Sequence, residues 1–241
     1  MQGGFILINK PNGITSHDVV NQLRKITKIK KIGHAGTLDP FAQGLLILAI
    51  GREYTRKLSF FQKMDKEYIA RLKLGAESDT FDRDGKIIKI KVKKIPTKKE
   101  VKDILNGFLG EFKQIPPIFS AKKIKGEKAY RLARKGVKFS LAPQKVKIFS
   151  ISLLKYNFPY LEVKVRCSKG TYLRSLAFDI GRKLGCGAYL DNLIRTKIGC
   201  FSIEKAVDLS KLDSENWRKF VFELKGQHRP PYQSFFLFCF C

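Results

Sequence analysis

Two side chains suited to catalysis lie in the loop of residues 33–40, which has the sequence GHAGTLDP. Asp39 carries a carboxylate that can act as a nucleophile or a base, and His34 carries an imidazole. The two glycines permit tight bends, and the Asp39–Pro40 step stiffens the end of the loop. An aspartate before a proline in a glycine-rich loop is also typical of a plain turn or a helix N-cap. The loop alone therefore leaves a catalytic and a structural interpretation open.

The segments around this loop are predicted to hold it against a core. Residues 5–8 predict an opening strand, and residues 9–13 predict the turn that ends it. Residues 15–18 offer N-cap side chains for a helix in which apolar residues recur at helical spacing. The apolar run of residues 45–50 predicts a short strand that is buried on both faces.

Hydrophobic periodicity predicts alternating strands and helices in the rest of the chain. The expected elements are a helix over residues 52–64, a strand over 66–75, a helix after a capping box at 97–100, strands over 146–154 and 161–167, and a helix that begins near 173. Residues 77–85 are rich in Asp, Ser and Thr, but they do not match an EF-hand because Lys91 stands where the bidentate glutamate is required. We interpret this segment as a turn-rich loop.

The charge of the chain indicates a polyanionic partner. There are 48 Lys and Arg residues against 21 Asp and Glu residues, which gives a net charge of +27 and a pI near 10.0. The basic residues are spread over the whole chain rather than along one amphipathic helix, so we expect nucleic acid and not a membrane surface. No apolar run is long enough for a membrane helix, and the N-terminus does not resemble a signal peptide.

The five cysteines include no C-x-x-C pair, which predicts reduced thiols in a cytoplasmic protein rather than disulfides or a metal site.

Several strings of the sequence resemble the motifs of the TruB-type tRNA pseudouridine synthases, and the resemblance covers residues 5 to 202 in order. The strings are GHAGTLDPxAxGLL at 33–46, INKPxGxTS at 8–16, DKxY at 65–68, KGTYxR at 169–174 and LxxLIRT at 190–196. The longest of them is far more specific than a short glycine motif. One departure is Ile194, which stands where many members of the family carry an arginine.

The resemblance implies an α+β fold with a mixed, largely antiparallel central sheet and flanking helices and loops. It implies an isomerase that flips the T-loop uridine at position 55 of tRNA out of its stack and converts it to pseudouridine. It implies no cofactor and no metal, because the glycosidic bond is broken at N1 and remade at C5 of the same base. The implied partner is the T-arm of tRNA, without a membrane or an obligatory protein partner.

The resemblance also assigns roles to residues in the loop motif and in two later motifs. Asp39 is the implied nucleophile, which attacks either C1′ of the ribose or C6 of uracil, and Arg174 is its implied counter-ion. Tyr68 is implied to lie against the flipped base and is a candidate for removing the C5 proton. His34 is implied to enter the vacated stack.

Further residues are implied to bind substrate or to support the site. Tyr172 is expected to support the pair of charged groups, Leu193 to touch the target nucleotide, and Lys169 to contact phosphate. Lys10 and Pro11 are expected to buttress the catalytic loop without taking part in the chemistry.

Two rival functions remain beside the enzyme. A non-catalytic RNA-binding module is supported by the charge alone, but it has no use for a carboxylate placed near RNA. A related synthase that depends on a guide RNA and partner proteins usually carries an extra RNA-binding domain. We expect one catalytic domain over residues 1–225, and an aromatic and cysteine-rich tail over residues 226–241 that is not a domain. We further expect that the small C-terminal RNA-binding domain of many family members is absent, through a truncated or frame-disrupted end.

Overall fold

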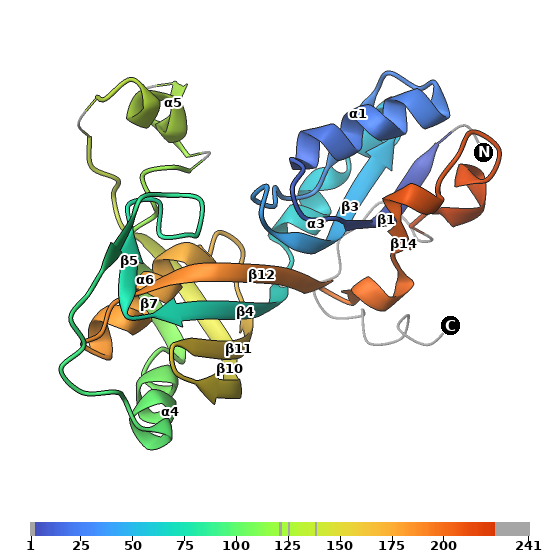
Figure 1. Ribbon diagram of the computed structural model, residues 1–241. Helices are drawn as coiled ribbons and strands as arrows, with labels where there is room; N and C mark the ends of the chain where they lie inside the picture. Colours follow the sequence, from blue (N-terminus) through green and yellow to red (C-terminus); the bar gives the residue numbers. More distant parts are fainter. Residues whose placement is uncertain (1–2, 121, 125, 138, 225–241) are drawn as a thin grey trace. The chain divides into compact units, whose positions relative to one another are not determined.

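The computed structural model describes residues 3–120, 122–124, 126–137 and 139–224, so the predicted tail of residues 226–241 lies outside the described residues. The chain divides into two compact units (Figure 1). Unit 1 comprises residues up to Lys63 together with those from Lys197 onward, and unit 2 comprises Met64–Thr196. Each unit is described by itself.

Unit 1 contains a small mixed sheet centred on two buried strands. In it β1 pairs antiparallel with β3 and β15 and parallel with β14, while β2 pairs antiparallel with β3. Its strands are β1 (Gly4–Lys10), β2 (Ile32–His34), β3 (Gln43–Ile50), β13 (Phe201–Ser202), β14 (Val207–Asp208) and β15 (Val221–Phe222). The predicted strands at residues 5–8 and 45–50 are confirmed, and both are buried because apolar side chains point to either face.

The helix that follows β1 covers this sheet. The helix α1 (Ser16–Thr27) begins with the predicted cap, in which Thr15 and Asp18 form a capping box. Its apolar side chains join those of the strands and Trp217 in one buried core cluster. The other helices of unit 1 are α2 (Arg52–Thr55), α3 (Leu58–Lys63) and the 3-10 turns η1 (Ile203–Lys205), η2 (Leu209–Lys211) and η3 (Trp217–Phe220).

The single helix predicted over residues 52–64 is wrong, because the chain forms two short helices with a break at residues 56–57. At the break the Thr55 hydroxyl donates a hydrogen bond to the carbonyl oxygen of Arg52 (3.0 Å). The backbone N–H of Lys57 donates to the carbonyl oxygen of Tyr54, three residues earlier, which is a tighter turn than that of an α-helix. Such back-bonding competes with the regular helix, and the like charges of Arg52 and Arg56 one turn apart disfavour it further.

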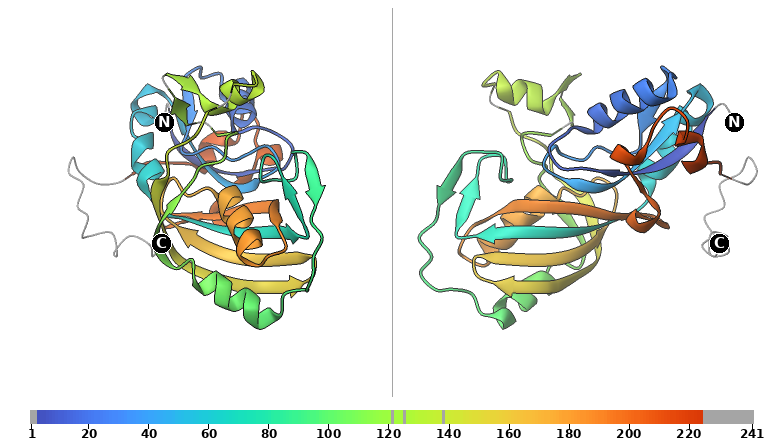
Figure 2. Two further views of the ribbon diagram at one scale, coloured as in Figure 1. Left: turned by 90° about the vertical axis from the view of Figure 1, so that its left-hand side faces the viewer. Right: turned by 45° about the vertical axis from the view of Figure 1, so that its right-hand side comes forward.

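Unit 2 is built on an antiparallel sheet with the strand order β12–β4–β11–β10–β7 (Figure 2). The predicted strands over 66–75, 146–154 and 161–167 are confirmed, although the second is longer than expected. Its strands are β4 (Lys66–Leu74), β7 (Gly110–Gln114), β10 (Gln144–Asn157), β11 (Tyr160–Cys167) and β12 (Ala188–Ile198), the last of which ends in unit 1. We did not predict β12, whose first three residues are all buried and hide the alternation of a strand.

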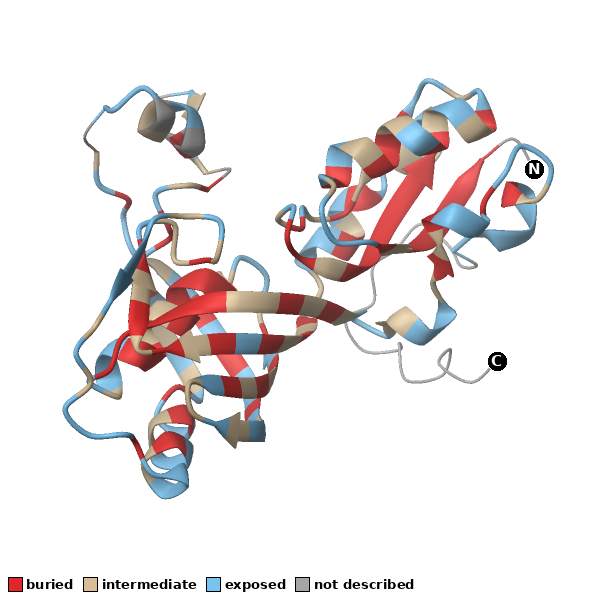
Figure 3. Ribbon diagram, viewed as in Figure 1, coloured by how far each residue is buried: buried red, intermediate tan, exposed pale blue. Residues whose placement is uncertain are grey.

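Two helices cover one face of this sheet. In β4 and β11 buried and more exposed residues alternate (Figure 3), so one face of the sheet is buried, and its residues are mostly apolar. The helix α6 (Leu173–Lys183) contacts β4, and α4 (Lys98–Asn106) contacts β10. The predicted capping box of α4, formed by Thr97 and Glu100, is confirmed. Unit 2 also contains the hairpin of β5 (Ala76–Ser78) and β6 (Ile87–Lys89), the short strands β8 (Lys123–Ile124) and β9 (Glu127–Lys128), and α5 (Ala129–Arg134).

These features confirm the predicted α+β class with a mixed, largely antiparallel sheet. In the described part of the chain, no helix is long and apolar enough to cross a membrane. Of the described cysteines, Cys167 and Cys186 are buried and Cys200 is exposed, and none of the three is part of a disulfide.

Candidate active site

The buried Lys10 side chain anchors the loop that carries Asp39. Its Nζ donates hydrogen bonds to the backbone oxygens of Ala42 (2.7 Å), Pro11 (2.9 Å) and Pro40 (3.3 Å). Lys10 is fully buried, and a buried ammonium requires such acceptors because its desolvation is otherwise costly. We call residues 35–42 the Asp39 loop. The conformation of this loop is therefore tied to the end of β1.

A second anchor comes from the first turn of α1. The backbone N–H of Leu38 donates to Ser16 Oγ (2.9 Å), and Ser16 Oγ donates back to the Leu38 carbonyl oxygen (3.2 Å). The backbone N–H of Gly13 donates to the carbonyl oxygen of Pro40 (2.9 Å). Asp39 lies between these two attachment points and is half-buried. The carboxylate is thus carried by a backbone that is fixed on both sides.

His34 lies just before the Asp39 loop, at the end of β2. It is half-buried, and its register partner on β3 is Leu48. The next residue, Ala35, donates its backbone N–H to the carbonyl oxygen of Ile47 (2.8 Å). The imidazole therefore occupies a defined position at the edge of the sheet of unit 1.

In unit 2, Tyr68 lies on β4 and Arg195 lies on the adjacent strand β12. Arg195 is 1% exposed and Tyr68 is 8% exposed. The Arg195 guanidinium forms a hydrogen bond with the Tyr68 side chain. Burial lowers the pKa of Arg195, while the contact with Tyr68 raises it. Arg195 therefore fixes the Tyr68 hydroxyl.

Lys66 precedes Tyr68 by two residues, so both side chains belong to the same face of β4. Lys66 is 8% exposed and donates to the carbonyl oxygen of Met64 (2.6 Å). Burial lowers the pKa of the Lys66 ammonium to about 8, and the positive charges of Arg195 and Lys169 also lower it. This end of the sheet therefore carries a buried, electropositive environment next to Tyr68.

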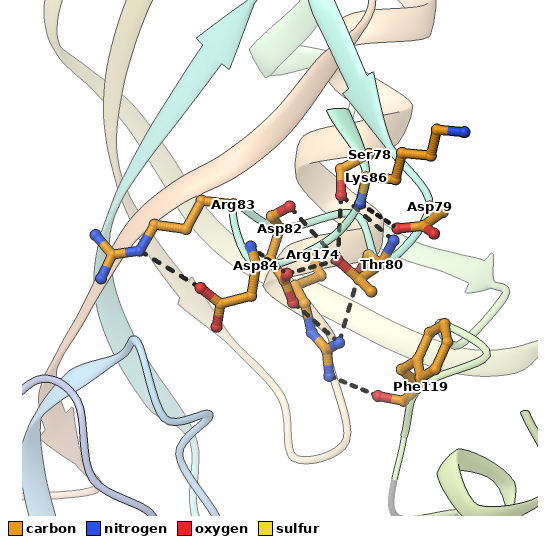
Figure 4. A network of polar contacts seen from close by, with 9 residues as sticks. All are labelled: Ser78, Asp79, Thr80, Asp82, Arg83, Asp84, Lys86, Phe119 and Arg174. Carbon is orange, nitrogen blue, oxygen red and sulfur yellow. Dashed lines mark hydrogen bonds and ion pairs between the residues drawn. The ribbon is translucent and has the colours of Figure 1, made fainter. Parts of the chain in front are cut away.

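Arg174 forms a buried ion pair with Asp82. Figure 4 draws this pair and its surroundings. The distance from Arg174 Nη1 to Asp82 Oδ2 is 3.2 Å, and the two side chains are 8% and 7% exposed. Arg174 comes from the first turn of α6, whereas Asp82 comes from the turn between β5 and β6. A buried ion pair of this kind is destabilised strongly when either partner is removed.

Further contacts fix both members of this pair. Thr80 Oγ1 donates to Asp82 Oδ1 (2.6 Å), and the backbone N–H of Asp84 donates to the same oxygen (3.1 Å). Arg174 Nη2 donates to the carbonyl oxygen of Phe119 (3.0 Å). We call these five residues the Arg174 network. It orients the planar guanidinium and leaves little freedom of rotation.

Tyr172 is held by Gln114, a buried residue at the end of β7. The Tyr172 backbone N–H donates to Gln114 Oε1 (2.8 Å), and Gln114 Nε2 donates to the Tyr172 carbonyl oxygen (3.1 Å). The Tyr172 side chain is half-buried. Leu193 on β12 is buried, whereas Lys169 is exposed in the turn before α6. An exposed lysine in that turn is accessible to an anionic ligand.

The structure gathers the predicted site residues into two groups. In unit 1, Lys10, Pro11, His34 and Asp39 lie on or beside one loop. In unit 2, Tyr68 and Leu193 belong to neighbouring strands, and Lys169, Tyr172 and Arg174 belong to the turn and first residues of α6. The role of Arg174 as counter-ion of Asp39 stays a prediction, and within unit 2 its ion-pair partner is Asp82.

Two residues of these groups were missed by the sequence analysis. Asp82 belongs to the segment that we interpreted as a turn-rich loop, and no local signal connects it with Arg174, 92 residues away. Arg195 carried a usable signal, since it stands two residues after Leu193 and so belongs to the same face of a strand.

No group of three or more His, Cys, Asp and Glu side chains in the described part of the chain is arranged to hold a metal ion. The available chemistry is that of an aspartate on a fixed loop, a tyrosine held by an arginine and an arginine held by an aspartate. An aspartate is suited to nucleophilic attack, and a tyrosine is suited to proton transfer.

Comparison with known proteins shows that the chain matches the models of one protein family. The model of the TruB family pseudouridylate synthase N-terminal domain matches residues 24–173, which is more than half of the chain. The chain belongs to the TruB family. A second model, described as the tRNA pseudouridylate synthase B C-terminal domain, matches residues 174–223. TruB family members are pseudouridylate synthases, so this chain is an enzyme of the isomerase class. The predicted absence of a further RNA-binding domain stays a prediction.

Individual relatives agree with the TruB assignment. The tRNA pseudouridine synthase B of Clostridium tetani is 49% identical over 218 residues, which cover 90% of this chain and 75% of the relative. The protein of the same name from Protochlamydia amoebophila is 49% identical over 205 residues, which cover 85% of this chain and 78% of the relative. A solved structure of a Cbf5–Nop10–Gar1 complex contains a chain with a TM-score of 0.68 and 29% identity. The match covers 87% of this TruB family chain and only 53% of that chain.

Proposed function

We propose that this TruB family enzyme converts the uridine at position 55 in the T-loop of tRNA to pseudouridine. The observation that carries the proposal is the 49% identity over 90% of the chain with a protein named tRNA pseudouridine synthase B. The net charge of +27 supports a polyanionic substrate of this kind. Action by the single chain, without cofactor or metal and in the cytoplasm, is part of the same proposal.

The first step requires a nucleophile that is ionised and already oriented. Asp39 attacks C1′ of the ribose or C6 of the uracil, and the bond between N1 and C1′ breaks. The two attachments of the Asp39 loop to Lys10 and Ser16 support this role, because they limit the motion of the carboxylate before attack. Arg174 supplies the positive charge that stabilises the carboxylate, and Asp82 acts as a positioning residue for Arg174.

The second step forms the bond between C5 and C1′, and the bond that Asp39 made to C1′ or C6 breaks, which restores the free carboxylate. The hydrogen at C5 leaves as a proton, and N1 takes up a proton, so the product is an isomer of the substrate. Tyr68 is the proposed acceptor of the C5 proton, and the buried Arg195 supports this role because its hydrogen bond holds the Tyr68 hydroxyl in place. Leu193 packs against the target nucleotide, Tyr172 supports the pair of Asp39 and Arg174, and His34 occupies the stack that the base has left.

A guide-dependent reaction with partner proteins is the alternative, and the similarity to a chain of the Cbf5–Nop10–Gar1 complex favours it. The test is to incubate the purified chain alone with an unmodified tRNA transcript that carries tritium at C5 of its uridines. Our proposal predicts tritium release from a single T-loop uridine, which is then located by mapping the pseudouridine. Release that requires an added guide RNA and proteins would overturn the proposal in favour of the alternative. Tight tRNA binding without release would indicate a non-catalytic RNA-binding module.

A further inference from the structure

Unit 2 contains a pocket of about 380 Å³ where the chain leaves α4 and where α6 ends. Arg174 and Arg182 are eight residues apart on α6, which corresponds to about 12 Å along the helix axis. The pocket is therefore separate from the Arg174 network. Its chemically distinctive lining consists of two phenylalanines, three cations and one carboxylate, which are Phe108, Phe112, Lys113, Arg182, Lys183 and Asp179.

The cations of this pocket favour an anionic ligand. Lys113, Arg182 and Lys183 are exposed, and none of the three forms an ion pair with any residue that the structure describes. Arg182 and Lys183 alone are ordinary for the last turn of a helix, where cations stabilise the free carbonyl groups. Lys113 comes from β7 and adds a third positive charge that the end of the helix does not require. Three cations around one cavity are suited to a phosphate group.

The aromatic side chains of the pocket favour a planar ligand. The rings of Phe108 and Phe112 meet edge to face with their centroids 5.8 Å apart. Lys183 Nζ lies 4.4 Å from the centroid of the Phe108 ring, so this ring is already covered by a cation. Phe112 is only half-buried and offers the surface on which a base can stack.

Asp179 gives the pocket a means to distinguish between bases. It is half-buried and forms no hydrogen bond with the side chains that the structure describes, and burial raises the pKa of its carboxyl group. A carboxylate accepts hydrogen bonds and so prefers a base with an exocyclic amine, such as cytosine with its N4 amino group. Uracil presents a carbonyl oxygen at the same position, which a carboxylate repels.

We propose that this pocket binds a nucleotide whose base carries an exocyclic amine, with the phosphate held by Lys113, Arg182 and Lys183 and the base beside Phe112 and Asp179. A free nucleotide and an unstacked nucleotide within RNA both present these groups to the pocket. The proposal goes beyond the isomerisation and does not depend on turnover.

Titration of the protein with cytidine and uridine monophosphates, followed by NMR, tests the pocket directly. We expect the cytidine nucleotide to bind at least about tenfold more tightly than the uridine nucleotide. Lys113→Gln weakens the binding of both nucleotides, and Asp179→Asn removes the preference between them. Lys99→Gln is the matched control, because Lys99 is an exposed lysine of α4 that does not line the pocket. Equal binding of both nucleotides, or equal effects of Lys113→Gln and Lys99→Gln, would overturn the proposal.

A second measurement separates the two sources of the nucleotide. If the ligand belongs to RNA, Lys113→Gln raises the Kd for tRNA more than Lys99→Gln does and leaves the rate of tritium release at saturating tRNA unchanged. If the ligand is a free nucleotide, the two variants bind tRNA equally while only Lys113→Gln loses the cytidine nucleotide. Absence of tritium release with intact nucleotide binding would contradict the proposed function and support the pocket.

Discussion

The Asp39 loop and the Arg174 network hold a charged side chain in two different ways. The Asp39 loop is attached through backbone groups, because Lys10 and Ser16 bond to its carbonyl and N–H groups. The Arg174 network instead bonds to the functional group itself, through the side chain of Asp82 and the carbonyl oxygen of Phe119. The position of Asp39 is therefore fixed through the backbone of its loop, whereas the guanidinium of Arg174 is fixed through its own charge.

Loss of the carboxylate of Asp82 is the largest effect that this comparison predicts. Asp82→Asn leaves the buried guanidinium of Arg174 without its ion-pair partner in unit 2, so we expect the free energy of unfolding to fall by about 3 kcal/mol and tritium release to fall strongly. Urea unfolding measures the first quantity. Asp84→Asn is the control, because Asp84 is exposed and its contact with Arg83 is 3.9 Å long; its effect should stay within about 0.5 kcal/mol. Equal losses of stability in Asp82→Asn and Asp84→Asn would show that the ion pair of Arg174 and Asp82 does not stabilise the fold.

Removal of the Lys10 ammonium should have a somewhat smaller effect. Lys10→Met removes the donor of three hydrogen bonds to backbone oxygens, and we expect a loss of about 2 kcal/mol in the free energy of unfolding. The rate of tritium release should also fall, because the Asp39 loop gains freedom. Lys25→Met, on the exposed side of α1, is the matched control. An unchanged rate of tritium release by a folded Lys10→Met variant would show that anchoring of the loop backbone is not needed for catalysis.

The buried Lys66 predicts a dependence of stability on pH. Its pKa is about 8 in the folded protein against 10.5 as the ordinary value, so between these values the unfolded chain binds more protons and the free energy of unfolding rises with pH. Lys66→Met removes this group. From pH 7 to pH 9.5, the free energy of unfolding of the natural chain should therefore rise by about 2 kcal/mol relative to that of the variant. Lys63→Met, an exposed neighbour, should show no such change. A constant difference across this range would refute the lowered pKa of Lys66.

The smallest effect belongs to Ser16. Ser16→Ala removes the hydroxyl that bonds to both backbone groups of Leu38, and we expect about 1 kcal/mol lower stability with a modest loss of activity. The double variant Ser16→Ala/Lys10→Met tests whether the two side chains act on the same loop. Since both side chains anchor the same loop, the two effects on tritium release should not be additive. Strict additivity would indicate two independent functions.

The sequence predicts those parts of the molecule that depend on neighbouring residues. The N-cap of α1, the capping box of α4 and the buried strand β3 follow from local patterns, and all three are present. The motif around Asp39 is contiguous, so its loop is visible in the sequence, although the contacts of Lys10 reach residues about thirty positions away. The break between α2 and α3 was missed because it depends on a single back-bonding threonine.

Contacts between distant segments could not be predicted in this way. Asp82 and Arg174 are 92 residues apart, and neither has a periodicity that points to the other. The contact between Arg195 and Tyr68 depends on β12 lying beside β4, and strand order is a property of the whole sheet. The residues that position the proposed catalytic groups were therefore harder to find than those groups themselves.

The most direct test of this account compares the natural chain with Asp39→Asn in the tritium-release assay on tRNA. We expect release from one T-loop uridine by the natural chain, no turnover by Asp39→Asn, and unchanged tRNA binding by both, because asparagine keeps the shape of the side chain but is not a nucleophile. Asp103→Asn, on the exposed side of α4, should release tritium normally. Full activity of Asp39→Asn would contradict the claim that the fixed carboxylate of the Asp39 loop carries the reaction.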